Sequence, residues 1–167
     1  ADIVHVSKTQ MLGHQGIATW ADIVTAHSIS GPDIIDAIHA AWGEVGRKGS
    51  VLILAQMSSS ENLLDARYTE KTVASCKGMP GVCGFIGNGS DPLSISSLRE
   101  SVGPEKLILT PGINFDPSQS VMGQRYGHPT EAIRSGADAV IVGSGIIRSD
   151  SVSKAAAQYA NATMDEM

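Results

Sequence analysis

Two apolar stretches in the second half of the chain decide the fold: LILTPGI at residues 107–113 and AVIVGSGI at residues 139–146. Each is an almost unbroken apolar run that ends in a turn containing glycine. Such a run, without polar alternation, is typical of a strand in a parallel sheet whose faces are covered by crossover helices. Loops after the last two strands of a (β/α)8 barrel commonly hold phosphate. The two stretches therefore predict parallel strands and a phosphorylated small-molecule ligand.

Three further apolar runs precede them, at residues 21–26, 51–57 and 82–87. Successive runs begin about 25 to 32 residues apart and are separated by segments with helical spacing, which is typical of βα units. Ser58, Ser59 and Ser60 are predicted to cap a helix that begins at Glu61. The other helices are expected over residues 6–19, 32–46, 93–101 and 130–135, and from Ser151 onward.

The number of units leaves two architectures open. The length of 167 residues suggests one domain, but a complete barrel needs about 250 residues. Five parallel strands could belong to a partial barrel or to an open, doubly wound sheet. A partial barrel would leave two open edges and an uncovered interior, so we expect such a chain to associate with another segment or copy.

Bulk properties exclude several classes of partner. The net charge is −5 and the pI is near 5.4, which argues against nucleic acid or an anionic membrane as the main partner. No stretch approaches the roughly 20 apolar residues of a membrane span, and no signal-peptide pattern opens the chain. Cys76 and Cys83 lack CxxC spacing, so we expect two reduced packing residues in a cytosolic protein.

Several motifs, taken in order, resemble orotidine 5′-monophosphate decarboxylase. They are ADIVTAH, LAQMSSSENL, GFIG, LTPGI followed by GQRY, and GADAVIVGSGI, and the opening ADI extends the match to the first residues. The resemblance implies a (β/α)8 barrel of the TIM-barrel family, of which residues 1–167 supply about five βα units, strands four to eight. It also implies a cofactor-free, cytoplasmic homodimer with its active sites at the interface, acting on a nucleotide in UMP biosynthesis.

The implied chemistry needs an Asp–x–Lys–x–x–Asp array. Decarboxylation leaves electron density on C6 of the pyrimidine, and the lysine ammonium stabilises and then protonates it. Asp2 matches the second aspartate, which in the family reaches the neighbouring subunit's site. The first aspartate and the lysine would precede Ala1, and Lys8 does not have the required offset. We therefore expect the isolated chain to be inactive without a longer chain or a complementing N-terminal segment.

The resemblance also implies the substrate-binding residues. Ser58 matches a serine that hydrogen-bonds the pyrimidine edge, although its position also suits the helix cap described above. Pro111 matches a residue that lines the base pocket, although a simple strand-ending turn would explain it too. Gln124 and Tyr126 match groups that reach the phosphate.

Backbone amides after the last strand complete the implied phosphate site. Gly143 and Gly145 match two such positions.

Two positions depart from the family pattern. Ser144 stands where the family has an arginine that forks onto the phosphate, and a hydroxyl cannot replace a bidentate guanidinium. Arg148 and Arg125 are candidates to compensate. Val6 stands where the family has a threonine that meets the ribose of the neighbouring site.

The histidines do not favour a metal site, because none of the five has HxH or HExxH spacing. His27 ends a predicted strand, where we expect a structural hydrogen bond.

Two other functions remain open. The departures at Ser144 and Val6 suit a degenerate, non-catalytic phosphate-binding or interaction subunit. A sugar-phosphate decarboxylase or aldolase of the same barrel superfamily is the third possibility.

Overall fold

The fold is built on a parallel sheet of five strands in sequential order. The computed structural model describes residues 3–116 and 123–166. The strands are β1 (Ile23–Ala26), β2 (Ser50–Leu54), β3 (Val82–Ile86), β4 (Leu107–Thr110) and β5 (Ala139–Val140). They pair in the order β1-β2-β3-β4-β5, each with its neighbour along the chain. A doubly wound sheet would reverse this order at a switch point, so the strand order favours consecutive strands of a barrel.

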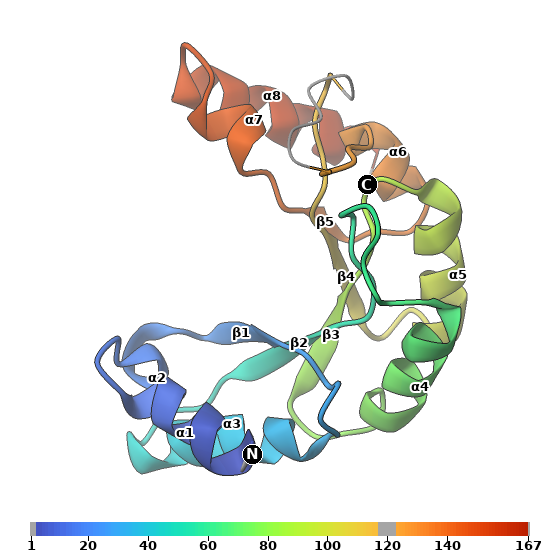
Figure 1. Cartoon of the computed structure of the whole chain (residues 1–167). Coiled ribbons are helices and arrows are strands. Elements are labelled where there is room, and N and C mark those ends of the chain that lie inside the picture. The colour runs from blue at the N-terminus through green and yellow to red at the C-terminus, as the bar shows by residue number, and fades with distance from the viewer. Residues whose placement is uncertain (1–2, 117–122, 167) are drawn as a thin grey trace.

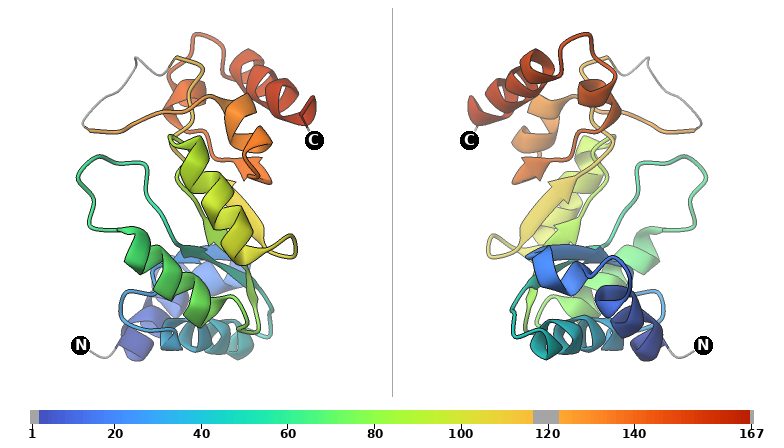
Figure 2. Two further views of the ribbon diagram at one scale, coloured as in Figure 1. Left: turned by 90° about the vertical axis from the view of Figure 1, so that its right-hand side faces the viewer. Right: turned by 90° about the vertical axis from the view of Figure 1, so that its left-hand side faces the viewer.

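The helices lie along the outer side of the curled sheet (Figures 1 and 2). Their bounds are α1 (Ile3–Leu12), α2 (Ile17–Trp20), α3 (Asp33–Glu44), α4 (Ala66–Cys76), α5 (Pro92–Val102), α6 (Pro129–Arg134), α7 (Ser144–Ile147) and α8 (Val152–Met164). The core lies between these helices and the outer face of the sheet. Its largest buried side chains include Trp42, Ile35, Ile95 and Leu98 from the helices and Val51, Ile53, Phe85 and Ile108 from the strands.

The expected strands are confirmed in number, and the run 21–26 ends at Ala26 as expected, but the runs 51–57, 107–113 and 139–146 leave the sheet at least three residues early. The run 107–113 is a strand only as far as Thr110, because Pro111 has no N–H to donate and Gly112 has a φ of 76°. The run 139–146 leaves the sheet after Val140, and its last residues already belong to α7. The chain thus leaves the sheet where the candidate site residues begin.

Two helix predictions are wrong in their boundaries. The single helix expected over residues 6–19 is two helices, because Gly16 adopts the left-handed region with a φ of 54°. The helix expected from Glu61 begins at Ala66 instead, and its cap is Asp65, whose Oδ1 accepts from the N–H of Tyr68 at 2.7 Å. The serines at 58–60 therefore do not cap α4.

The concave side of the sheet has no helix layer in Figure 1. Among the described residues, no strand pairs with the outer edge of β1 or of β5. Apolar side chains on these strands and just after them are consequently open to solvent: Ile23 is 50% exposed and Ile141 is 42% exposed. This is the open-edged arrangement expected of a partial barrel.

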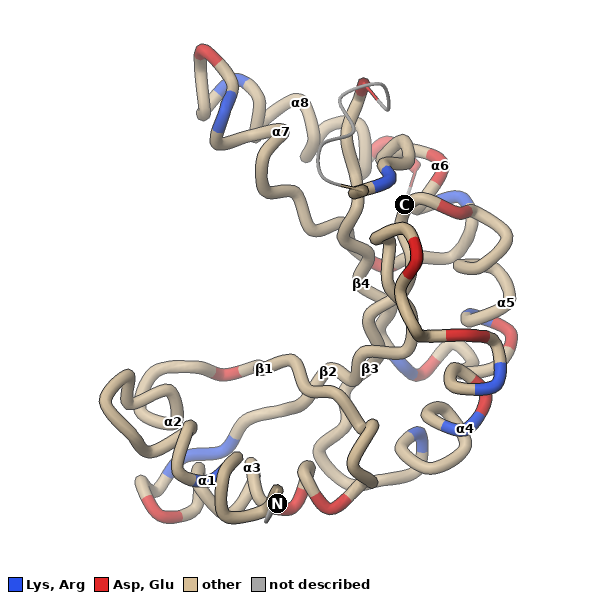
Figure 3. The backbone as a smooth tube through the Cα atoms, in the orientation of Figure 1, with Lys and Arg blue, Asp and Glu red and all other residues tan. Residues whose placement is uncertain are grey.

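Charged residues and thiols are distributed over many elements of the fold. Acidic and basic residues alternate along the chain without a continuous basic block (Figure 3). Within the part of the chain that the structure describes, no helix combines the length and the apolar character that a membrane span needs. Cys76 and Cys83 are both free thiols, and burial raises the pKa of each.

Candidate functional site

The loops after β2 and β4 meet at the carboxyl edge of the sheet. Ser58, in the first loop, is buried, and its Oγ accepts a hydrogen bond from Gln124 Nε2 at 2.5 Å. The backbone adds an antiparallel bridge between Ser59 and Gln124, and the N–H of Arg125 donates to the Ser58 carbonyl at 3.3 Å. Two predicted ligand residues from distant parts of the sequence thus lie in direct contact.

A turn at Pro111 and Gly112 brings the end of β4 against Ser58. The Pro111 carbonyl accepts from the N–H of Gly89 at 3.1 Å, and the Gly112 carbonyl accepts from the N–H of Gly127 at 2.8 Å. A Cβ placed on Gly112 would lie 2.5 Å from the Ser58 Cβ, closer than any real side chain tolerates. Glycine is required at position 112 because the backbone has a positive φ and lies close to Ser58. The turn places Pro111 next to the Ser58–Gln124 pair.

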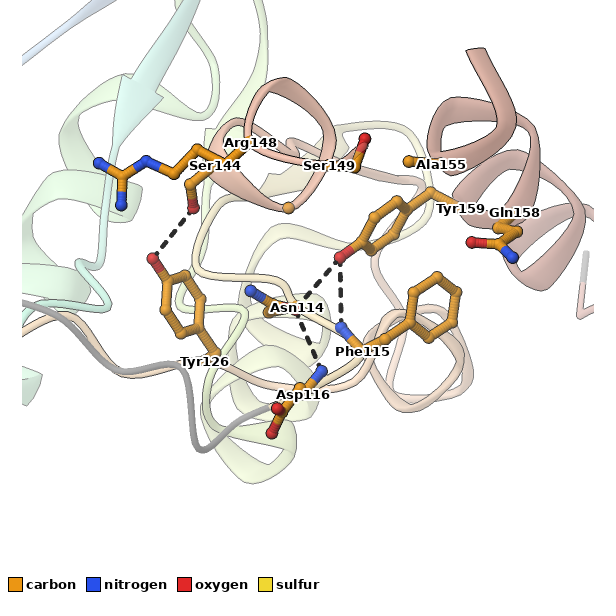
Figure 4. A pocket seen from close by; sticks show the side chains of 11 residues that line it. Asn114, Phe115, Asp116, Tyr126, Ser144, Arg148, Ser149, Ala155, Gln158 and Tyr159 are labelled. Carbon is orange, nitrogen blue, oxygen red and sulfur yellow. Dashed lines mark hydrogen bonds between the residues drawn. The ribbon is translucent and has the colours of Figure 1, made fainter. Parts of the chain in front are cut away.

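A cavity of about 300 Å³ lies between the loop after β4, α7 and α8 (Figure 4), and Ser58, Pro111 and Gln124 do not line it. Tyr126 extends into it, and its hydroxyl lies 3.3 Å from Ser144 Oγ, at hydrogen-bond distance. Gly145 also lines the cavity. Gly143 does not. It is exposed, and its carbonyl accepts from the N–H groups of Ile146 and Ile147, both at 3.0 Å.

The aromatic residue Tyr159 shapes the opposite wall of the cavity, which the sequence analysis missed. Its hydroxyl donates to Asn114 Oδ1 at 3.3 Å and accepts from the N–H of Phe115 at 3.2 Å. The rings of Tyr159 and Phe115 lie 4.4 Å apart. A Cβ on Gly145 would lie 2.4 Å from the Tyr159 hydroxyl, so this glycine lets α8 approach α7. The sequence analysis expected a helix from Ser151 onward but gave no signal for the polar contacts of Tyr159.

Arg148 and Asp116 are the charged side chains among the described residues that line this cavity. None of the six lysines lines the cavity. Lys8 pairs with Glu44, Lys77 donates to the Ser101 carbonyl at 3.0 Å, and Lys106 donates to the Val82 carbonyl at 2.5 Å. Among the described residues, the cavity therefore offers one guanidinium, one carboxylate and no ammonium.

The remaining candidates lie away from this cavity or outside the description. Asp2 lies outside the described residues. Val6 is 43% exposed on α1. The Nδ1 atom of His27 is buried without a hydrogen-bond partner in the described part of the chain, so the hydrogen bond expected of it is wrong for this nitrogen. The described residues contain no cluster of three or more metal-ligating side chains.

Comparison with known proteins gives one consistent answer. The chain is 35% identical to the uridine 5′-monophosphate synthase of Bos taurus, covering 99% of this chain and 33% of that protein. It is 38% identical to the orotidine 5′-phosphate decarboxylase of Mycosarcoma maydis, covering 84% of this chain and 49% of that protein. A crystal structure of orotidine 5′-phosphate decarboxylase from Pyrococcus horikoshii OT3 matches the fold with a TM-score of 0.76 at 22% identity, covering 98% of this chain and 70% of that one.

The chain thus spans between one third and about half of the length of these two sequence relatives. A family model described as orotidine 5′-phosphate decarboxylase / HUMPS matches residues 1–159. The strand order, the shared carboxyl edge and this match agree, and the chain belongs to the orotidine 5′-phosphate decarboxylase / HUMPS family.

Proposed function

We propose that this chain forms the substrate-holding part of an orotidine 5′-phosphate decarboxylase, which converts OMP to UMP without a cofactor. The observation that carries the proposal is the contact between Ser58 and Gln124. Gly112, directly after Pro111, packs closely against Ser58, and Tyr126 follows Gln124 by two residues. These residues come from the loops after β2 and β4, and the resemblance assigns each of them to the same nucleotide. One ligand at the carboxyl edge could therefore touch all four.

The hydrogen-bonding capacity at Ser58 suits a pyrimidine edge. A serine hydroxyl has one proton to donate and two lone pairs that accept. Its Oγ accepts from Gln124 Nε2, so its own proton remains available for a carbonyl oxygen or ring nitrogen of the base. Pro111 contributes an apolar surface next to it. The base is placed here, and the phosphate is placed at the Tyr126 and Ser144 hydroxyls and the backbone at Gly145.

The decarboxylation step needs a group that these residues do not supply. Loss of CO₂ leaves an electron pair on C6, which must be stabilised and then protonated. The 167 residues contain no Asp–x–Lys–x–x–Asp sequence, and none of the described lysines lines the cavity. The proposal therefore assigns nucleotide binding to these residues and the proton donor to a complementing segment, with Asp2 next to it in the array. Association with that segment or a second copy, in the cytoplasm, belongs to the same proposal.

Calorimetric titration with UMP and a 6-substituted UMP analogue tests the binding half. Ser58→Ala should weaken binding about threefold to tenfold, because one neutral hydrogen bond contributes about 0.5–1.5 kcal/mol. Ser153→Ala, at an exposed position on α8, is the matched control and should leave the affinity unchanged. Failure of the unmodified chain to bind UMP, even with the complementing segment present, would overturn the proposal.

Release of labelled CO₂ from carboxyl-labelled OMP tests the catalytic half. We expect none from the isolated chain and turnover once a segment carrying the Asp–x–Lys array is added. Rapid UMP production by the isolated chain would show that the proton donor lies within these residues.

A non-catalytic phosphate-binding subunit is the second candidate. It is favoured by Ser144, which replaces the charged group expected on the phosphate, and by Val6, which removes a ribose contact. Under this alternative the complemented chain would bind phosphate compounds and release no CO₂.

A further inference from the structure

We propose that Arg148 binds the phosphate of the nucleotide and supplies the charge that Ser144 lacks. The inference rests on the proposed function, because it takes the ligand of this cavity to be a nucleotide monophosphate. The resemblance implies an arginine at position 144, and the sequence alone left Arg148 and Arg125 as equal candidates to replace it. The structure separates the two.

Arg148 lies one helical turn after Ser144 and lines the same cavity. Its backbone N–H donates to the Ser144 carbonyl at 3.1 Å, which fixes the two residues on one side of α7. In Figure 4 the Arg148 side chain extends past Ser144, and its guanidinium lies on the same side as the Tyr126 hydroxyl. Tyr126 and Ser144 are themselves at hydrogen-bond distance. Two hydroxyls and one guanidinium therefore converge on one end of the cavity.

Arg125 is placed differently. Its Nε donates to the Ser58 carbonyl at 3.2 Å, so it holds the loop after β2 in place. It lines a separate cavity between the loops that precede α4 and α5, together with Gln56 and Asn88. Its guanidinium is thus engaged in the structure and is not part of the wall near Tyr126.

The Arg148 guanidinium is free to bind a ligand. No hydrogen bond or ion pair of this guanidinium occurs in the described structure, and the side chain is exposed. Three other arginines have carboxylate partners: Arg47 with Asp22, Arg99 with Asp138 and Arg134 with Glu166. An unengaged guanidinium can present two parallel N–H groups to phosphate oxygens.

The acidic residue Asp116 lines the same cavity and limits where an anion can lie. Figure 4 places it across the cavity from the Arg148 guanidinium, below Asn114. Repulsion from this carboxylate favours the Tyr126–Ser144 end for a phosphate dianion. Both the attraction and the repulsion therefore direct the phosphate to Arg148.

Calorimetric titration of the 167-residue chain with UMP and with uridine tests the inference. Arg148→Ala should weaken UMP binding about tenfold and should leave uridine binding unchanged. Tenfold is the lower end of the affinity loss expected for a charge-assisted hydrogen bond, because the guanidinium is exposed. Arg148→Lys should recover part of the loss. Arg67→Ala, an exposed arginine on α4, changes the net charge equally and should alter UMP affinity less than twofold.

A second substitution separates a phosphate contact from a structural effect. In a Ser144→Arg background, Arg148→Ala should have little effect on UMP affinity, because the new guanidinium reaches the same phosphate. Equal UMP affinities of Arg148→Ala and Arg67→Ala, with UMP still bound by the unmodified chain, would overturn the role of Arg148 while leaving nucleotide binding intact. No UMP binding by the unmodified chain, even with the complementing segment present, would instead overturn the proposed function, and the inference with it.

Discussion

Replacing Gly112 by alanine should damage the contact that joins the loops after β2 and β4. Gly112 has a φ of 76°, and its added Cβ would lie 2.5 Å from the Ser58 Cβ and 2.6 Å from its Oγ. The left-handed backbone costs a non-glycine residue about 1–2 kcal/mol. Overpacking against Ser58 adds about 1–3 kcal/mol. We expect the free energy of unfolding to fall by about 2–5 kcal/mol in Gly112→Ala.

Two other glycines separate these contributions. Gly46 has a φ of 69° and open space where an added Cβ would lie. Gly46→Ala should therefore lower the free energy of unfolding by about 1–2 kcal/mol, from backbone strain alone. Gly143 has a negative φ and open space, so Gly143→Ala should change stability by less than about 0.5 kcal/mol. Urea denaturation followed by circular dichroism measures all three. Equal losses in Gly112→Ala and Gly46→Ala would refute the close approach of Gly112 to Ser58.

The double variant Ser58→Gly with Gly112→Ala gives a further check. Removing the Ser58 Cβ removes its clash with the new Cβ, so the double variant should lose less stability than the sum of the two single variants. Additive losses would place the strain of Gly112→Ala elsewhere, such as at the Arg125 carbonyl, which would lie 3.1 Å from the new Cβ.

Two further predictions concern the helix α4. Asp65→Ala removes the side chain that accepts from the N–H of Tyr68, so urea denaturation should show the free energy of unfolding lowered by about 1 kcal/mol. Ser59→Ala should lower it very little, because Ser59 is not the cap. Equal losses in the two variants would contradict the assigned cap. Burial raises the pKa of the Cys76 thiol, so the stability it contributes is present at neutral pH and is lost as the pH rises above about 8.5. Iodoacetamide at pH 8 should therefore modify Cys76 much faster in urea than in the folded chain, and equal rates would contradict its burial.

The strands could be predicted from sequence because each is a short apolar run, and the last three also end at a glycine or proline. Periodicity does not report where the hydrogen bonds of the sheet stop. Residues 111–113 and 141–146 continue the apolar pattern, yet they leave the sheet and form the turn at Gly112 and the helix α7. The predicted strands are too long at their carboxyl ends, because the turns and loops there determine the backbone conformation more strongly than strand propensity does.

The start of α4 shows why local rules for helix caps gave the wrong residue. Ser58, Ser59 and Ser60 are all good cap residues, and so is Asp65. The serines are instead held by the distant loop, through the Ser59–Gln124 bridge and the N–H of Ser60, which donates to the Gly123 carbonyl at 2.8 Å. A contact between residues more than sixty positions apart has no local signature. The resemblance to a family suggests a ligand role for Ser58, and this role stays a prediction.

The proposed function separates nucleotide binding from proton transfer along the barrel. Interactions that hold the phosphate and base bind substrate and transition state alike, and they lower the barrier only when a group acts on the charge developing at C6. The Ser58–Gln124 and Tyr126–Ser144 contacts link the loops after β2, β4 and β5, so the surface proposed to hold the nucleotide lies within the described residues. The Asp–x–Lys–x–x–Asp array is not assembled within the described residues. The open edge of β1 lies where a preceding strand of the barrel would pair. A segment that pairs with this edge would therefore both cover Ile23 and deliver the ammonium, and restored activity should accompany protection of the β1 amides from hydrogen exchange.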